Sequence, residues 1–342
     1  MLLSLRRALA VVVVVAAAAG TAGAGAAEPF RLITTDLEPQ LVPNSVMDLA
    51  ASLGYFEREG VEVELVRVQQ TPSAIAALQA GEGEMANVSV DAVLQLVARD
   101  QMKLKAVVSP NKSLPFLIAG KADIAALPDL AGRSFGVGRV GSLDHSLSTR
   151  VLASEGVDTG AIDFVAIGQP NVRAQALAAG QIDATTMSIG VWLAMPDKAG
   201  LHVLVDPDAY YAAAPVLNKV NVVPDAVLAA RRDDVTKVVR AIVKASRDFA
   251  EHPEKWVDAM VAARPDVDRA TLEQLARQFA GSWSVNGGLN RDELQQTLDW
   301  QYATPDFQGL RRVGIDEWVD LSVLGAILDS EGVAGESDAP SL

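Results

Sequence analysis

Residues 77–89, "ALQAGEGEMANVS", and residues 176–188, "ALAAGQIDATTMS", share one pattern, and this pattern predicts the fold. In each copy an alanine-rich helical segment stops at a glycine, Gly81 or Gly180, and a short strand follows. Polar residues lie six and eight positions beyond each glycine and form two matched pairs: Asn87 with Thr186, and Ser89 with Ser188. The simplest interpretation is two similar lobes, and the alternative is coincidence among alanine-rich helices.

The residues before each copy extend this match. Each half of the chain predicts a strand, a helix, a strand, a helix and a strand, in that order. The predicted ranges are 30–36, 43–60, 61–68, 71–83 and 84–89 in the first half, and 133–138, 142–156, 162–168, 172–181 and 182–188 in the second. Alternating strands and helices indicate an α/β fold with mostly parallel sheets.

In parallel sheets, ligands bind at the carboxyl ends of the strands. Four segments follow such ends: 37–45, 87–91, 138–146 and 186–190. If the two lobes face each other, these segments meet in the cleft between them. The polar and aromatic residues in or just after these segments are the predicted ligand-binding residues: Glu38, Gln40, Asn44, Asn87, Ser89, Arg139, Gly141, Ser142, His145, Thr186, Ser188 and Trp192.

The segment 136–141, "GVGRVG", also fits the G-x-G-x-x-G pattern of dinucleotide-binding turns. Against that interpretation, it lies in the second lobe and not in the first strand-helix unit. Its glycines let the backbone turn sharply and approach a ligand, and Ser142 is a suitable helix N-cap, behind which backbone amides can hold an anion. An anion-binding loop is therefore the favoured interpretation, and a capped helix start without a ligand stays open.

Charged and aromatic residues near this predicted cleft leave further alternatives open. Arg139, Arg173 and Lys112 could bind an anionic ligand, or be ordinary surface charges. His145 could donate a hydrogen bond to the ligand or lie on the surface, and Trp192 could wall the pocket or belong to the core. The sequence contains no G-x-S-x-G and no H-E-x-x-H motif. We therefore predict no catalytic residues, no metal site and no cofactor.

Residues 1–27 have the pattern of a secretory signal peptide. Arg6 and Arg7 precede an uncharged apolar run over 8–19, which is shorter than the about 20 residues that span a bilayer. Small residues follow, and cleavage is expected near Ala26 or Ala27. A membrane anchor or a buried helix is the alternative. We predict export to the periplasm.

The chain contains no cysteine, which excludes disulfides, thiolate metal sites and a cysteine nucleophile. It also excludes a lipid-modified cysteine after the leader, so the protein is expected to diffuse freely, as a monomer. The formal net charge of −14 becomes −16 when the two leader arginines are removed. Such a charge repels nucleic acid and anionic lipid.

Five stretches together resemble the periplasmic solute-binding proteins of ABC importers, most closely the sulfonate, nitrate, taurine and thiamine-precursor type. They are "DLAASLGYFEREGVEVELV", "ALQAGEGEMANVS", "LPDLAGRSFGVGRVGS", "VLASEGVD" and "ALAAGQIDATTMS". One departure is Glu84, where such proteins usually carry Asp. The resemblance implies two α/β lobes joined by two crossing strands, a ligand cleft between them, and delivery of a small, anionic organic solute to a membrane permease and its ATPase.

The resemblance also implies the limits of the lobes. Lobe 1 takes residues 28–116 and 217–334, lobe 2 takes 117–216, and 335–342 form a disordered tail. Two other functions stay open. One is a pyrimidine-precursor synthase on the same fold, against which the leader and the lack of cysteine both count. The other is a binding protein that docks on a membrane sensor.

Overall fold

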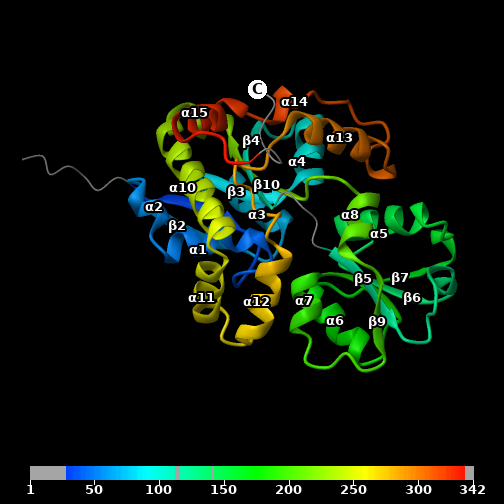
Figure 1. Cartoon of the computed structure of the whole chain (residues 1–342). Coiled ribbons are helices and arrows are strands. Elements are labelled where there is room, and N and C mark those ends of the chain that lie inside the picture. The colour runs from blue at the N-terminus through cyan, green and yellow to red at the C-terminus, as the bar shows by residue number, and fades with distance from the viewer. Residues whose placement is uncertain (1–27, 112–115, 141, 336–342) are drawn as a thin grey trace, which may run out of the picture.

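The computed structural model describes residues 28–111, 116–140 and 142–335, which form two α/β lobes, each around one five-stranded sheet (Figure 1). The predicted signal peptide, residues 112–115, Gly141 and residues 336–342 of the predicted tail lie outside the described residues. We keep the names lobe 1 and lobe 2 for the parts around the first and the second sheet. The limits of the lobes within the chain stay a prediction.

The sheet of lobe 1 has the strand order β2-β1-β3-β10-β4. Its strands are β1 (Phe30–Thr34), β2 (Val63–Arg67), β3 (Met85–Ser89), β4 (Leu104–Asn111) and β10 (Lys219–Pro224). The first three are parallel, as the alternation of strands and helices predicts, whereas β10 is antiparallel to both β3 and β4. The carboxyl ends of β1, β2 and β3 therefore lie on one edge, where β10 begins.

The sheet of lobe 2 repeats this plan with the order β7-β6-β8-β5-β9. Its strands are β5 (Phe116–Lys121), β6 (Ser134–Val137), β7 (Asp163–Ala166), β8 (Ala184–Ser188) and β9 (Leu201–Val205). Here β6, β7 and β8 are parallel, and β5 is antiparallel to β8 and β9. In both lobes, then, the third strand of the repeat pairs with an antiparallel strand that follows a crossing between the lobes.

Helices cover both sheets. Those of the two repeats are η1 (Pro43–Ser45), α1 (Val46–Ser52), α2 (Tyr55–Arg58), α3 (Thr71–Gln79) and α4 (Val90–Ala98) in lobe 1, and η2 (Leu127–Leu130), α5 (Leu143–Ser154), η3 (Thr159–Ala161), α6 (Pro170–Ala178), α7 (Ile189–Ala194) and α8 (Pro207–Ala213) in lobe 2. The single helix predicted over 43–60 is interrupted, because Gly54 has a left-handed φ of 73° and starts a separate turn of helix.

The chain after β10 is helical, as the apolar spacing of three and four predicts. It forms α9 (Asp225–Ala230), α10 (Arg232–Glu251), α11 (Pro253–Ala263), α12 (Arg269–Gln278), α13 (Arg291–Tyr302), η4 (Pro305–Phe307), α14 (Ile315–Trp318) and α15 (Leu321–Glu331). This part of the chain adds Phe249 of α10, Trp256 of α11 and Trp283, between α12 and α13, to the large apolar core of lobe 1, where the Trp283 ring contacts the other two. Lobe 2 has two smaller apolar clusters.

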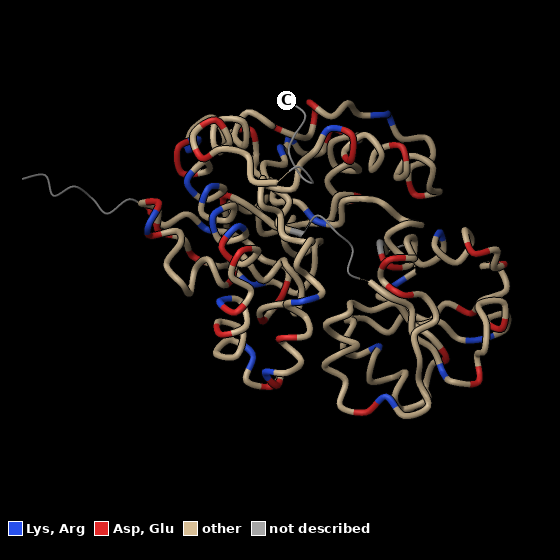
Figure 2. Tube along the Cα trace, in the orientation of Figure 1, with Lys and Arg blue, Asp and Glu red and all other residues tan. Residues whose placement is uncertain are grey.

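Acidic and basic residues are interspersed along both lobes (Figure 2). Among the described residues, no helix is both long enough and apolar enough to cross a bilayer.

One carboxylate holds the same position in each lobe, three residues after the glycine that stops the helix. Glu84 accepts a hydrogen bond from the backbone N–H of Arg31 (2.7 Å), and Asp183 accepts one from the backbone N–H of Ser134 (3.0 Å). Glu84, just before β3, therefore bonds to the start of β1, and Asp183, just before β8, bonds to the start of β6. A basic side chain neutralises each carboxylate: Arg31 at 2.6 Å from Glu84, and Lys121 at 2.8 Å from Asp183. Glu84 thus does in lobe 1 what Asp183 does in lobe 2.

Replacing Asp183 by Asn tests this role through its pH dependence. Burial alone would raise the pKa of Asp183, but hydrogen bonds from Lys121 and Ser134 outweigh it and hold the pKa at about 2. A carboxyl whose folded pKa lies below its unfolded value stabilises the fold above the unfolded value and loses this effect as the pH falls through the folded one. We expect Asp183→Asn to lower the free energy of unfolding by about 1–3 kcal/mol at pH 7.

The measurement is urea unfolding of the parent chain and the variant from pH 7 down to pH 2. The difference between the two chains should shrink as the pH falls from about 4 toward 2. A difference that stays constant over this range would show that the ionised carboxylate is not the stabilising species.

Candidate functional site

The two lobes touch at the edges where the parallel strands end. Leu41 lies in the loop after β1, and Gly190 lies in the first turn of α7, directly after β8. A Cβ placed on Gly190 would lie 2.2 Å from the carbonyl oxygen of Leu41, so the two backbones are in close contact. Gln169 of lobe 2 also donates to the carbonyl oxygen of Gln69 of lobe 1 (3.3 Å). Two of the four segments predicted to meet, 37–45 and 186–190, do meet here.

Three buried asparagines form a chain of hydrogen bonds on the lobe 1 side. Asn44 donates to Asn87 (3.1 Å), and Asn87 donates to Asn221 (2.7 Å). Asn44 and Asn87 are among the predicted site residues, and the fold brings them together. Asn221 was not predicted, because it becomes a neighbour of Asn87 only through the antiparallel pairing of β10 with β3.

The asparagine chain generates a prediction. Asn87→Ala removes the central member and leaves the amide of Asn44 and the carbonyl oxygen of Asn221 without this partner. A buried polar group that loses its partner costs about 1–3 kcal/mol. We expect the melting temperature to fall by several degrees, and Asn87→Asp to restore less than half of the loss, because it introduces a buried charge. An Asn87→Ala chain that melts at the parent temperature would contradict the prediction.

Charged groups lie beside the asparagines at the same edge. Lys219, at the start of β10, donates to the hydroxyl of Thr35 (2.7 Å) and lies 3.5 Å from the carboxylate of Asp36. Arg67, at the end of β2, forms a 2.6 Å ion pair with Asp48. Burial raises the pKa of both carboxyls, and the basic partners oppose this shift. None of these four charged residues was predicted, although Asp36 is the last residue of the predicted strand 30–36 and Arg67 the last but one of the predicted strand 61–68.

The other predicted residues of lobe 1 have separate positions. Glu38 is exposed and forms an ion pair with Arg264 (3.5 Å). Gln40 is half-buried and hydrogen-bonds to the carboxyl of Asp36. Ser89 occupies the N-cap position of α4, and its backbone N–H donates to the hydroxyl of Thr71 (3.2 Å).

In lobe 2, Arg173 organises a buried polar cluster. Its guanidinium donates to the hydroxyl of Thr185 (3.1 Å) and the carbonyl oxygen of Thr186 (3.0 Å), and lies 3.4 Å from the carboxylate of Asp144. Burial lowers the pKa of Arg173, and the charge of Asp144 opposes this. Predicted residue Thr186 also shares a 2.6 Å hydrogen bond with Ser148. Arg173, considered as a cation for the ligand, is instead buried and engaged within its own lobe.

A carboxylate of the protein itself is hydrogen-bonded to the glycine loop. The backbone N–H of Gly138 donates to the carboxylate of Asp144 in the first turn of α5 (2.7 Å), so a side chain of the protein already takes the amide that a phosphate would need. Ser142 occupies the N-cap position of α5, but its hydroxyl donates to the carbonyl oxygen of Arg139 (2.6 Å), accepts from the backbone N–H of Arg139 (3.3 Å) and caps no backbone amide of the helix. The expected capping by Ser142 is therefore wrong in its detail. Gly141, another predicted site residue, lies outside the described residues.

The remaining predicted residues of lobe 2 differ in their contacts and exposure. The ring of His145 packs edge-on against Phe164, with centroids 4.6 Å apart. Ser188 accepts a hydrogen bond from the backbone N–H of Val191 and caps α7. Trp192 is half-buried, and Arg139 is exposed.

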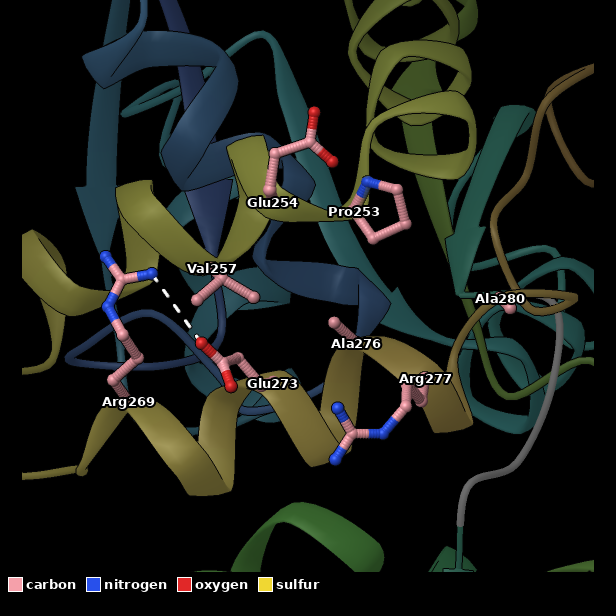
Figure 3. A pocket seen from close by; sticks show the side chains of 8 residues that line it. All are labelled: Pro253, Glu254, Val257, Arg269, Glu273, Ala276, Arg277 and Ala280. Carbon is pink, nitrogen blue, oxygen red and sulfur yellow. Dashed lines mark ion pairs between the residues drawn. The ribbon is translucent and has the colours of Figure 1, made fainter.

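A shallow hollow of about 430 Å³ lies elsewhere, between α11 and α12 (Figure 3). Val257 and Ala276 are among its apolar lining, and the ion pair of Arg269 with Glu273 (3.9 Å) runs along its α12 side. None of the predicted site residues lines it. Within the described part of the chain, no cluster of three or more His, Asp or Glu side chains is arranged to hold a metal ion.

These features define a two-lobed α/β protein of the periplasmic binding protein fold, with polar residues gathered where the lobes meet. The family model described as "NMT1/THI5 like" matches residues 45–256, and the chain belongs to this family. No curated protein matches the sequence significantly.

Solved structures support the fold assignment. The alkanesulfonate-binding protein SsuA from Xanthomonas axonopodis pv. citri, bound to MOPS, is 20% identical with a TM-score of 0.65, over 86% of this chain and 100% of that one. The periplasmic aliphatic sulphonate binding protein SsuA from Escherichia coli is 14% identical with a TM-score of 0.66, over 86% and 92%. The desulfurization enzyme DSZB is 17% identical with a TM-score of 0.59, over 88% and 99%. At these identities the likeness shows the fold alone.

The contact between Leu41 and Gly190 generates a prediction about the lobes. Gly190→Ala adds a methyl group against a backbone carbonyl, which cannot rotate away as a flexible side chain can. The lobes must then move apart, although alanine itself favours the helix. We expect a larger radius of gyration in small-angle X-ray scattering. Gly281→Ala is the control, because a Cβ there meets no atom within 4 Å. An unchanged radius in Gly190→Ala would mean that the lobes are not held at this point.

Proposed function

We propose that the protein is the solute-binding component of an ABC import system, and that it captures a small, anionic organic solute between its lobes. The observation that carries the proposal is the meeting of the two lobes at the carboxyl ends of their parallel strands, with buried polar groups on both sides. Membership of the NMT1/THI5-like family supports it. So does the shared fold with two sulfonate-binding proteins.

Binding physics supplies the mechanism. A ligand that contacts both lobes favours the arrangement in which the lobes are close. Lobe 1 offers Asn44 and Asn87, and lobe 2 offers Thr186 and the start of α7. Closing the lobes over the ligand removes water, and fixed polar groups set its orientation. No bond in the solute has to be made or broken, so we propose binding and not catalysis.

The charges near the meeting edges suggest where an anion binds. Lys219 and Arg67 each have a carboxylate beside them, Asp36 and Asp48 respectively. The guanidinium of Arg139, in contrast, forms no ion pair with any described residue. Arginine binds two oxygens of a carboxylate or sulfonate at once. We therefore propose Arg139 as the anion-binding side chain.

The same proposal includes location and partners. The N-terminal 27 residues act as a cleaved signal peptide, and the mature monomer carries its solute through the periplasm to a membrane permease with a cytoplasmic ATPase. The enzyme alternative has one specific observation in its favour, the shared fold of the desulfurization enzyme DSZB. A pyrimidine-precursor synthase is disfavoured by the absence of cysteine.

A thermal-shift screen of the chain from Glu28 onward tests the proposal. The panel contains alkyl and aromatic sulfonates, aliphatic and aromatic carboxylates, nitrate, bicarbonate, pyrimidines and nicotinamide nucleotides. A ligand at 100 times its dissociation constant adds about 2.7 kcal/mol to the stability, which raises the melting temperature by several degrees. We expect a shift with one anionic class.

Arg139→Ala should reduce that shift, and Arg277→Ala, an exposed arginine in the hollow between α11 and α12, should not. A shift that is equal in the two variants would remove Arg139 from the site. A panel without any shift would contradict the proposed ligand class. A shift with nicotinamide nucleotides alone would identify "GVGRVG" as a dinucleotide-binding turn.

A further inference from the structure

Helix α13 belongs to the helical part that covers lobe 1, but one of its side chains packs into lobe 2. Leu294 and Leu298 lie in the apolar core of lobe 1. Trp300 lies in an apolar cluster of lobe 2, together with Leu147 and Val151 of α5, and it is only 8% exposed. A single helix therefore contributes to the cores of both lobes.

Two further contacts join this end of α13 to lobe 2. The guanidinium carbon of Arg150, on α5, lies 4.8 Å from the centroid of the Trp300 ring, at the distance of a cation–π contact. The hydroxyl of Ser146, in the first turn of α5, donates to the carboxylate of Asp306 in η4 (3.2 Å). Both contacts are polar or charged and can be broken without exposing a large apolar surface.

Helix α13 is also attached to the segment that crosses between the lobes. The backbone N–H of Leu217, two residues before β10, donates to the buried hydroxyl of Thr297 (3.0 Å). Thr297 and Trp300 are three positions apart and so lie on neighbouring positions of one helix face. Thr297 therefore attaches the helix to the crossing segment, and Trp300 attaches it to lobe 2.

The indole N–H of Trp300 makes no hydrogen bond within the described part of the chain in this arrangement of the lobes. Its Nε1–H is buried and has no hydrogen-bond partner among the described residues. Buried tryptophan N–H groups usually find a partner, because an unpaired donor costs free energy. An unpaired N–H is expected of a tryptophan that contacts lobe 2 in one arrangement of the lobes and is released to solvent in another.

We infer that Trp300 and Arg150 form an interlobe strap: a contact that holds lobe 2 close to lobe 1 and so determines how far the two lobes separate. The inference depends on the proposed function only in its last step, the effect on solute affinity. A protein that binds its ligand in one lobe arrangement has an apparent affinity set by the population of that arrangement. Loosening the strap reduces this population without altering any side chain at the edges where the strands end.

The distance between the lobes can be measured directly, because the chain has no cysteine. Two exposed alanines, Ala178 on α6 and Ala262 on α11, are replaced by cysteine and spin-labelled, one on each lobe. Pulsed electron paramagnetic resonance then gives the distribution of distances without any ligand. We expect Trp300→Ala and Arg150→Ala to shift the distribution toward longer distances, with Trp300→Phe and Arg150→Lys intermediate.

Leu298→Ala is the matched control, because it lies on the same helix but packs into lobe 1 alone. It should lower the melting temperature and leave the distances unchanged, whereas the strap variants should change the distances. If Trp300→Ala does not fold, Arg150→Ala tests the strap from its charged side, and Asp306→Asn tests the neighbouring contact with Ser146. A distribution in the strap variants that matches the parent overturns the inference, and so does a shift toward shorter distances.

A solute found in the thermal-shift screen gives the second readout. We expect Arg150→Ala to weaken its affinity about ten-fold, with the same preference among solutes. An unchanged affinity would overturn the link between strap and binding. If no solute binds the parent chain, the proposed function fails, and the distance measurement still decides whether the strap exists.

Discussion

The parallel pairing of three strands in each lobe is the constraint on which the rest of this structure depends. Parallel strands end at one common edge, so the loops after β1 and β3 lie together in lobe 1, and those after β6 and β8 lie together in lobe 2. Buried polar residues gather at and near each edge, among them Asn87 and Asn221 in lobe 1 and Thr186 in lobe 2. The two edges face each other at Leu41 and Gly190, on the two sides of the proposed site.

On both sides of the proposed site, most of the buried polar groups have hydrogen-bond partners within their own lobe. The asparagine chain of lobe 1 and the cluster around Arg173 in lobe 2 hold their side chains in place before any ligand arrives. Such preorganisation reduces the entropy that binding must overcome. It also restricts the choice of ligand contacts, because Arg173 and the amide of Gly138 are already engaged.

The lobes are connected by more than the two crossings of the chain. Helix α13 supplies Leu298 to one core and Trp300 to the other, and it binds the crossing segment at Leu217. The position of lobe 2 is thus linked to packing outside the cleft. Residues far from a ligand can therefore influence its affinity through the populations of lobe arrangements.

The sequence by itself determined the alternation of strands and helices in the two repeats, their mostly parallel pairing and the helical C-terminal part, because apolar periodicity and helix-stopping glycines are local signals. It also predicted that the segments of Asn44 and Asn87 lie together, and the two side chains form a hydrogen bond. Only the tertiary structure decided that Asn221 completes their chain, that Arg173 is paired with Asp144, and that Trp300 packs into the opposite lobe. These outcomes depend on antiparallel pairing and on contacts between distant segments, and no local pattern encodes such contacts.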